Sequence, residues 1–130
     1  MFFSDDKGKL SEGYKIFSGH FGFCPREDIF ARVANENKIE KRDGIVTVFY
    51  TDRLSFFRTL FCYLVTGRTE NPSSAFKKTG IMLDCARNGV PSLSFLKTFI
   101  LSSVAAGYDY LGLYVEDCIE VEDEPHFGYM

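Results

Sequence analysis

The chain has 130 residues, of which 45% are apolar, 16% aromatic and 25% charged, and its formal net charge is -3. This composition is typical of a globular protein with one ordinary core, or with one small domain and part of another. The slightly negative charge and the lack of a Lys/Arg cluster argue against nucleic acid and against a membrane surface as partners. No apolar run approaches the roughly 18 residues needed to span a bilayer. The acidic start "MFFSDDKGK" does not resemble a signal peptide, so we expect a cytoplasmic protein.

A short helix is predicted for the segment "LSEGYKIFSGHF", residues 10–21. Its apolar and aromatic residues recur at helical spacing, at Leu10, Tyr14, Phe17 and Phe21. Ser11 is a candidate N-cap, whereas Gly13 and Gly19 weaken the prediction because glycine disfavours helix interiors.

Three strands are predicted next, over residues 28–35, 38–42 and 45–50, from their alternating and β-branched residues. Asp43 and Gly44 stand between the last two strands, and this dipeptide is a strong signal for a tight hairpin. We expect the three strands to form an antiparallel meander against which a helix packs.

That helix is predicted for "DRLSFFRTLFCYLVTG", with Asp52 as its N-cap and Gly67 at its end. The expected buried face contains Leu54, Phe57, Leu60, Phe61 and Leu64. The aromatic side chains of this segment favour packing in a core or between domains over a ligand site, because they recur at helical spacing: Phe56, Phe57, Phe61 and Tyr63.

A polar stretch rich in turn formers, "GRTENPSSAFKKTG", separates this module from the rest of the chain. We therefore predict an N-terminal α+β domain over residues 1–70, a linker over 71–79 and a second unit over 80–130. Limited proteolysis is expected to cut this linker first.

From Gly80 onward the pattern becomes strand, helix, strand. "GIMLDC" is predicted as a buried strand, "PSLSFLKTFILSSVAAG" as a helix capped by Ser92 and ended by Gly107, and "YDYLGLYVED" as a second strand. The expected buried stripe of the helix is Leu93, Leu96, Ile100 and Val104. Phe95 and Phe99 lie off this stripe and should contact a second surface such as the N-terminal module.

Strand, helix and strand in this order form a βαβ unit, whose strands are parallel and end on the same edge of the sheet. The polar residues that follow the two strands should therefore share one rim: Asp84, Arg87, Tyr114, Glu116 and Asp117. In parallel α/β folds this rim is where ligands bind.

The segment from Gly80 to Met130 resembles the start of the catalytic barrel of glycoside hydrolase family 20, the β-N-acetylhexosaminidases. The similarity is closest to the bacterial branch whose first strand reads Leu-Asp-Cys-Ser-Arg, whose second ends in Tyr-Thr-Glu-Asp, and in which a Glu-Pro-Tyr-Phe-Gly-Tyr-like segment follows. Here Ala86 replaces the serine, Val115 the threonine and His126 the tyrosine. Residues 1–70 similarly resemble the small domain that precedes this barrel.

The resemblance implies a (β/α)8 TIM barrel, so the expected fold class is α/β, with an α+β module before the first βαβ unit of the barrel. It also implies that Arg87 binds hydroxyl groups of a terminal N-acetylhexosamine, while Asp84 orients Arg87. Glu116 and Asp117 are further candidates for contacts with the substrate or with the residues that hold it.

Family members hydrolyse by a substrate-assisted retaining route, in which an Asp-Glu pair later in the barrel acts on the acetamido group and the leaving oxygen. No segment of this sequence matches that pair, and Glu116-Asp117 has the reverse order. We therefore expect a fragment of such a hydrolase, without catalytic residues, cofactor or metal, that is inactive by itself.

Other interpretations stay open. Asp84 and Arg87 could form a structural ion pair, and the chain could be a non-catalytic module that binds a sugar or a partner. The acidic stretch "EDCIEVEDEP" favours a solvated loop over a calcium site because it does not fit an EF-hand. The two barrel strands would leave open backbone edges, so self-association is expected.

The cysteines lie far apart and show no metal-ligand spacing, which favours buried, reduced thiols: Cys24, Cys62, Cys85 and Cys118.

Overall fold

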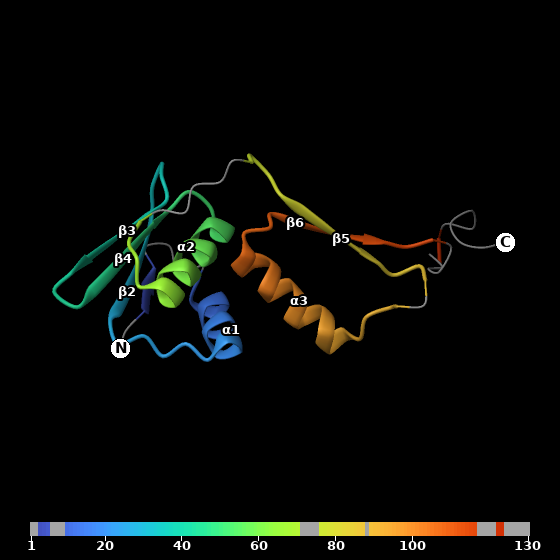
Figure 1. Ribbon diagram of the computed structural model, residues 1–130, viewed down its shortest axis with the longest axis horizontal. Helices are drawn as coiled ribbons and strands as arrows, with labels where there is room; N and C mark the ends of the chain where they lie inside the picture. Colours follow the sequence, from blue (N-terminus) through green and yellow to red (C-terminus); the bar gives the residue numbers. More distant parts are fainter. Residues whose placement is uncertain (1–2, 6–9, 71–75, 88, 117–121, 124–130) are drawn as a thin grey trace.

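The computed structural model describes residues 3–5, 10–70, 76–87, 89–116 and 122–123. Within these residues the chain is a mixed α/β structure with three helices and six strands in two sheets. Figure 1 shows the four-stranded sheet at one end, helices α1 and α2 against it, helix α3 beyond them, and the two-stranded sheet on the far side of α3. The described elements, in chain order, are β1 (Phe3–Asp5), α1 (Ser11–Phe21), β2 (Asp28–Val33), β3 (Lys38–Arg42), β4 (Ile45–Tyr50), α2 (Arg53–Thr66), β5 (Gly80–Asp84), α3 (Leu93–Ala106) and β6 (Tyr110–Tyr114).

The first sheet has the strand order β1-β2-β4-β3. Strand β2 is parallel to both β1 and β4, and only β3 and β4 are antiparallel. The three strands predicted from the sequence are confirmed, although the first ends at Val33 and not at residue 35. The predicted meander is wrong, because β4 lies between β2 and β3.

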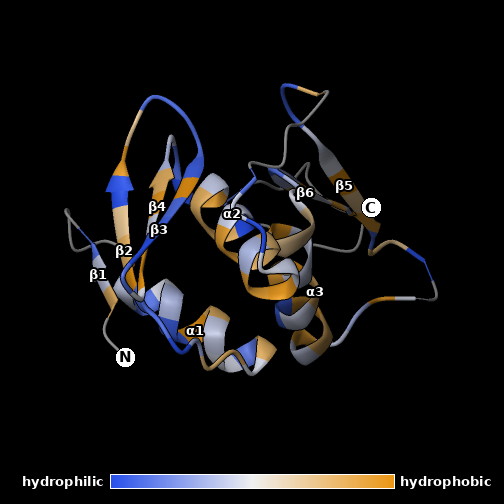
Figure 2. Ribbon diagram, turned by 60° about the vertical axis from the view of Figure 1, so that its left-hand side comes forward, coloured by the Kyte–Doolittle hydropathy of each residue, from blue (hydrophilic) through white to orange (hydrophobic). Residues whose placement is uncertain are grey.

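The side chains explain this strand order. Strand β4 is central and buries Val46, Val48 and Tyr50, whereas β3 has the sequence KIEKR and lies at the edge. Charged side chains suit an edge strand because they remain in water and discourage further strand pairing. Figure 2 shows the same contrast, with hydrophobic residues along β2 and β4 and hydrophilic residues along β3.

The hairpin between β3 and β4 is confirmed. Asp43 has φ 49° and Gly44 has φ 76°, so both turn residues adopt the left-handed conformation. A two-residue turn of this kind matches the twist of the strands that it joins, and aspartate and glycine tolerate it best.

Helix α1 is confirmed, but Ser11 is not its N-cap. The cap residue is Leu10, which has no capping side chain, and its backbone N–H donates to Asp5 Oδ2 at 2.8 Å. Strand β1 therefore stabilises the start of the helix, and Phe3 in that strand stacks on Tyr14 with ring centroids 4.2 Å apart. No sequence pattern signals β1, since three residues are too few for a periodic pattern.

The two glycines inside α1 have different surroundings. A Cβ atom on Gly13 would lie 2.8 Å from Cζ of Phe57, whereas a Cβ on Gly19 would meet nothing within 4 Å. Gly13 therefore leaves room for the Phe57 ring of α2 to lie against α1, and Gly19 has no such role.

We expect Gly19→Ala to raise the free energy of unfolding by about 0.5–1 kcal/mol, the usual helix-propensity gain. Gly13→Ala should lower it instead, because overpacking costs about 1–3 kcal/mol and outweighs that gain. Urea denaturation of both variants measures the difference. Equal stabilisation by the two substitutions would contradict close packing of the Phe57 ring on Gly13.

Helix α2 begins and ends as predicted. Asp52 caps it, with Ser55 N–H donating to Asp52 Oδ1 at 3.0 Å, and Gly67 ends it at φ 68°. Of the predicted buried face, Leu60 is fully buried and Phe57 and Leu64 are partly buried against the core, but the other most deeply buried residues are Phe56, Thr59 and Tyr63.

Helix α2 contacts two surfaces, the sheet and α1, so its buried side chains do not lie on a single stripe. Phe56 packs near Tyr50 of the sheet, with ring centroids 5.5 Å apart. Phe57 and Phe61 turn toward α1, where their rings lie 5.0 Å and 6.2 Å from that of Phe17. The aromatic side chains of α2 therefore belong to the core and to the contact between helices, as the sequence indicated.

The core of the first sheet lies between its inner face and the two helices. Its members are apolar or aromatic and buried: Leu10, Tyr14, Ile29, Ala31, Ile39, Val46, Val48, Tyr50, Phe56, Leu60 and Tyr63.

The predicted βαβ unit is confirmed as β5, α3 and β6, with β5 and β6 parallel. Ser92 caps α3 by accepting from Phe95 N–H at 3.2 Å, and Gly107 ends the helix at φ 89°. Whether the chain divides into domains at residues 71–79 stays a prediction.

Only part of the stripe predicted for α3 is buried, since Leu96 and Val104 are half-buried whereas Leu93 is 67% and Ile100 42% exposed. The buried residues are Ser103 and Ala105 near the C-terminal end, where α3 contacts α2. A Cβ on Gly107 would lie 2.7 Å from Arg58 Nε, so the Arg58 side chain of α2 lies against this end of α3. The helix also contacts α1, which confirms that it touches the N-terminal module, although Phe95 itself is 52% exposed.

Strand β5, predicted as a buried strand, is only partly buried. Met82 is 69% exposed and Tyr110 is 61% exposed, because α3 covers one face of the β5–β6 sheet only. In the described part of the chain, no helix is both long and apolar enough to cross a membrane.

Candidate functional site

The carboxyl ends of β5 and β6 lie side by side, as the sequence predicted. Asp84 pairs with Tyr114 in the strand register, and Cys85 N–H donates to the Tyr114 carbonyl oxygen at 2.8 Å. Both ends point away from the four-stranded sheet, toward the right of Figure 1. The last strand residues and the loops that follow them thus form one rim.

Asp84 and Arg87 meet at this rim. Asp84 Oδ1 accepts from the backbone N–H of Ala86 at 2.9 Å, which fixes the start of the loop, and Asp84 Oδ2 lies 3.8 Å from Arg87 Nε. The Arg87 side chain is 77% exposed, and no other residue in the described ranges pairs with its guanidinium group. Most of its N–H donors are therefore free to bind a ligand.

This ion pair contributes little to the stability of the fold. Exposed pairs contribute about 0–1 kcal/mol because water screens the charges and the side chains lose freedom. At 3.8 Å the contact is also too long for a hydrogen bond, so most of the guanidinium group stays exposed to solvent.

Glu116 lies at the same rim but contacts a different neighbour. The Tyr114 hydroxyl donates to Glu116 Oε1, and both side chains are exposed. Among the residues that the structure describes, no hydrogen bond or ion pair joins Glu116 to Arg87. Asp117, the remaining predicted site residue, lies outside the described residues.

An open face adjoins the rim on the side of the sheet away from α3. By strand alternation this face carries Gly80, Met82 and Asp84 of β5, and Tyr110 and Tyr114 of β6. A Cβ on Gly80 would overlap the ring of Tyr110, so the ring lies across the glycine. The face therefore presents two tyrosine side chains, and the rim lies at one end of it.

A second polar cluster lies in the N-terminal half and was not predicted. Glu27 precedes β2, Lys41 lies in β3, and Tyr63 lies near the end of α2. Lys41 Nζ is 2.7 Å from Glu27 Oε1, and the Tyr63 hydroxyl donates to the same oxygen at 3.3 Å. The cluster borders a cavity of about 270 Å³. No sequence motif signals it, because the partners of Glu27 lie 14 and 36 residues away.

The contacts within this cluster favour the charged forms of Glu27 and Lys41. The hydrogen bond from Lys41 holds the pKa of the Glu27 carboxyl below its usual value, with a smaller contribution from Tyr63. The hydrogen bond to Glu27 likewise raises the pKa of Lys41. The two groups are thus present as carboxylate and ammonium at neutral pH.

Glu27→Gln should lower the free energy of unfolding at neutral pH and have less effect in acid. A carboxyl with a lowered pKa stabilises the folded state fully above its unfolded pKa of about 4.3, and this contribution disappears as the pH falls through the folded value. Urea denaturation of wild type and variant at about pH 7 and about pH 2.5 measures the change. Glu36→Gln, at a more exposed ion pair with Lys38, is the control. An equal loss at both pH values would contradict the lowered pKa.

Among the described residues, neither the cysteines nor other potential metal-binding side chains form a further site. Cys24 is exposed, against the prediction of a buried thiol, whereas Cys62 and Cys85 are partly buried; all three are free, and Cys118 lies outside the described residues. Among the residues that the structure describes, no group of three or more His, Cys, Asp or Glu side chains is placed to hold a metal ion.

Comparison of the whole sequence with models of protein families found no match, and neither did comparison with curated proteins.

Proposed function

We propose that this chain contributes to a β-N-acetylhexosaminidase-like glycoside hydrolase of family 20, and that Arg87 binds hydroxyl groups of a terminal N-acetylhexosamine. The observation that carries the proposal is the rim itself, where parallel strands place Asp84, Arg87 and Glu116 at one edge. The exposed guanidinium group supports it, because a planar group with several N–H donors can bind two neighbouring hydroxyls at once.

The proposed fold is the first βαβ unit of a (β/α)8 barrel. In such a barrel the helices form an outer ring, and the other face of the strands points inward. Two features support this interpretation: α3 covers one face of β5 and β6, and the uncovered face carries large side chains over glycines, as at Tyr110 and Gly80. Ligands bind at the carboxyl ends of barrel strands, where Arg87 lies.

Each candidate residue has a proposed role. Asp84 orients Arg87 through the contact of 3.8 Å and holds the loop through Ala86. Glu116 accepts from Tyr114 and is proposed to contact the sugar or to fix that tyrosine. Asp117 is proposed as a further contact from the same loop.

Catalysis needs more than these residues. Substrate-assisted cleavage requires a carboxylate pair that positions the acetamido group and protonates the leaving oxygen. The sequence has no match to that pair, so the 130-residue chain should bind without cleaving. A chromogenic N-acetylglucosaminide should give no hydrolysis above a buffer blank.

The test of binding is an NMR titration of the ¹⁵N-labelled chain with N-acetylglucosamine. We expect saturable shifts of the amides of Asp84, Arg87 and Glu116, with an affinity in about the millimolar range. Arg87→Ala should abolish them. Arg42→Ala is a matched control, because Arg42 is also exposed and lies 3.9 Å from a carboxylate, Glu40. Shifts that survive in Arg87→Ala, or no shifts at the rim, would refute the role of Arg87.

A non-catalytic sugar-binding module is the second candidate. The open face favours it, because Tyr114 lies at the rim, Tyr110 lies at the other end of β6 on the same face, and both side chains are exposed. Titration shifts that extend along β6 to Tyr110, and an affinity that Tyr110→Ala weakens, would support this alternative. Shifts confined to the rim would support the hydrolase-like site.

A further inference from the structure

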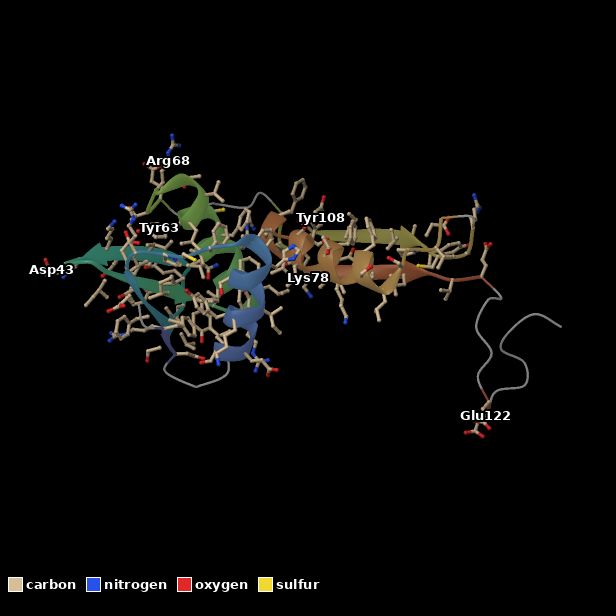
Figure 3. The ribbon with its side chains drawn as sticks, turned by 90° about the horizontal axis from the view of Figure 1, so that it is seen from below. Asp43, Tyr63, Arg68, Lys78, Tyr108 and Glu122 are labelled. Atoms are coloured by element: carbon tan, nitrogen blue, oxygen red, sulfur yellow. The ribbon has the colours of Figure 1, made fainter. Side chains whose placement is uncertain are left out.

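The cavity beside Glu27 is formed by three separate parts of the first half of the chain. The loop before β2 contributes Phe23 and Glu27, β3 contributes Lys41, and the end of α2 contributes Tyr63, Leu64 and Gly67. Its volume is about 270 Å³, close to the lower end of the range for small-molecule sites. Figure 3 labels Tyr63 in this half of the molecule, at the end opposite to β5 and β6. The cavity is therefore separate from the Arg87 rim.

The polar groups of the cavity are only partly used by one another. Lys41 has three N–H donors; Glu27 takes one and the Tyr63 hydroxyl takes a second, which leaves one for a ligand. Lys41 and Tyr63 both donate to Oε1 of Glu27. Among the described residues, no side chain donates to Oε2. The Tyr63 hydroxyl donates to Glu27 and accepts from Lys41. The cluster can thus donate to a ligand and accept from it at adjacent positions.

The charges limit the class of ligand. An anion would meet the Glu27 carboxylate and the carbonyl end of α2, which carries partial negative charge. A cation would meet Lys41, which already neutralises Glu27 at 2.7 Å. Neither kind of ion gains a free counter-charge, so a neutral ligand is favoured.

Hydroxyl groups fit these partners best, because each hydroxyl both donates and accepts. A ligand with two neighbouring hydroxyls could accept from Lys41 and donate to Glu27 at once. Phe23 and Leu64 supply apolar surface for the carbon skeleton. The Glu27 and Lys41 side chains are 22% and 48% exposed, so both can be reached from solvent.

We propose that this cavity is a binding site for a neutral, polyhydroxylated small molecule of about the size of one sugar ring. Glu27 and Lys41 bind its hydroxyls, and Tyr63 holds Glu27 in place. The site does not depend on Arg87 or on the function proposed for the rim.

The test is an NMR titration of the ¹⁵N-labelled chain with myo-inositol and with D-glucose. Saturable shifts are expected for the amides of Glu27, Lys41 and Gly67, in about the millimolar range. Inorganic phosphate and putrescine, one anion and one cation, should not produce them. No saturable shifts with either neutral probe, or shifts with a charged probe alone, would overturn the proposal.

Variants identify the residues that bind. Glu27→Gln and Lys41→Met should each weaken binding about tenfold or more, as expected for hydrogen bonds to charged groups. Lys38→Met is the matched control, since Lys38 lies in the same strand and pairs with Glu36 and Glu40 outside the cavity lining. If Glu27→Gln does not fold, Tyr63→Phe removes one bond to Glu27 and should weaken binding more modestly. If Lys41→Met and the folded variants of Glu27 and Tyr63 all bind with wild-type affinity, the assignment is overturned. Arg87→Ala should have no effect on binding in this cavity.

Discussion

Replacement of Phe56 by alanine is expected to lower the free energy of unfolding by about 3–5 kcal/mol, the usual cost of removing a buried phenylalanine. Phe56 has no exposed surface, and its ring lies 6.0 Å from Phe3, 5.5 Å from Tyr50 and 5.1 Å from Phe57. It therefore joins β1, β4 and α2 in one core, and few neighbours can move to fill the space. Urea denaturation followed by circular dichroism measures the loss.

Phe95→Ala provides the matched control, because it removes the same atoms from an exposed position on α3. Phe95 is 52% exposed and its main aromatic contact is a stacked ring, Phe99, at 5.8 Å. Its loss should be less than about 1 kcal/mol. Similar losses for the two variants would contradict the placement of the core between the first sheet and α2.

Arg87→Ala is expected to have the second large effect, on activity. In a hydrolase that contains this segment within a complete barrel, the substitution should lower kcat/KM by about 2–4 kcal/mol, because substrate hydroxyls would be left unpaired. Steady-state kinetics with a chromogenic N-acetylglucosaminide measures the effect. Arg87→Lys should fall between wild type and alanine, since lysine keeps the charge but loses the planar pair of donors.

The same substitution should leave stability almost unchanged. The Arg87 side chain is 77% exposed, and its contact with Asp84 is long at 3.8 Å. Arg42→Ala should change neither activity nor stability, although Arg42 has a similar exposed contact with Glu40. Wild-type kinetics in Arg87→Ala, or a loss of activity explained by unfolding, would refute a direct role in binding.

The sequence by itself determined the local structure well. Asp52 and Ser92 as helix caps, Gly67 and Gly107 as helix ends, and the Asp43-Gly44 turn are all confirmed. These features depend on hydrogen bonds and backbone angles within three or four residues, so their signals are contained in short segments.

The rim was also predictable, for a related reason. Once two strands and an intervening helix are recognised, the parallel pairing follows, and it places Asp84 beside Tyr114. Arg87 follows Asp84 by only three residues, so the two side chains can approach each other at the start of the loop. What these residues bind cannot be read from this geometry and stays a proposal.

Only the tertiary structure decided which faces are buried and which distant groups meet. Strand β4 takes the centre of the first sheet, α2 divides its aromatic side chains between that sheet and α1, and α3 buries its C-terminal end rather than the whole of its apolar stripe. Periodicity shows that a segment is helical, but a helix with apolar residues on several sides can pack on any of them, and its neighbours make the choice. The Glu27, Lys41 and Tyr63 cluster arises in the same way, because its members come together only when β2, β3 and α2 are packed.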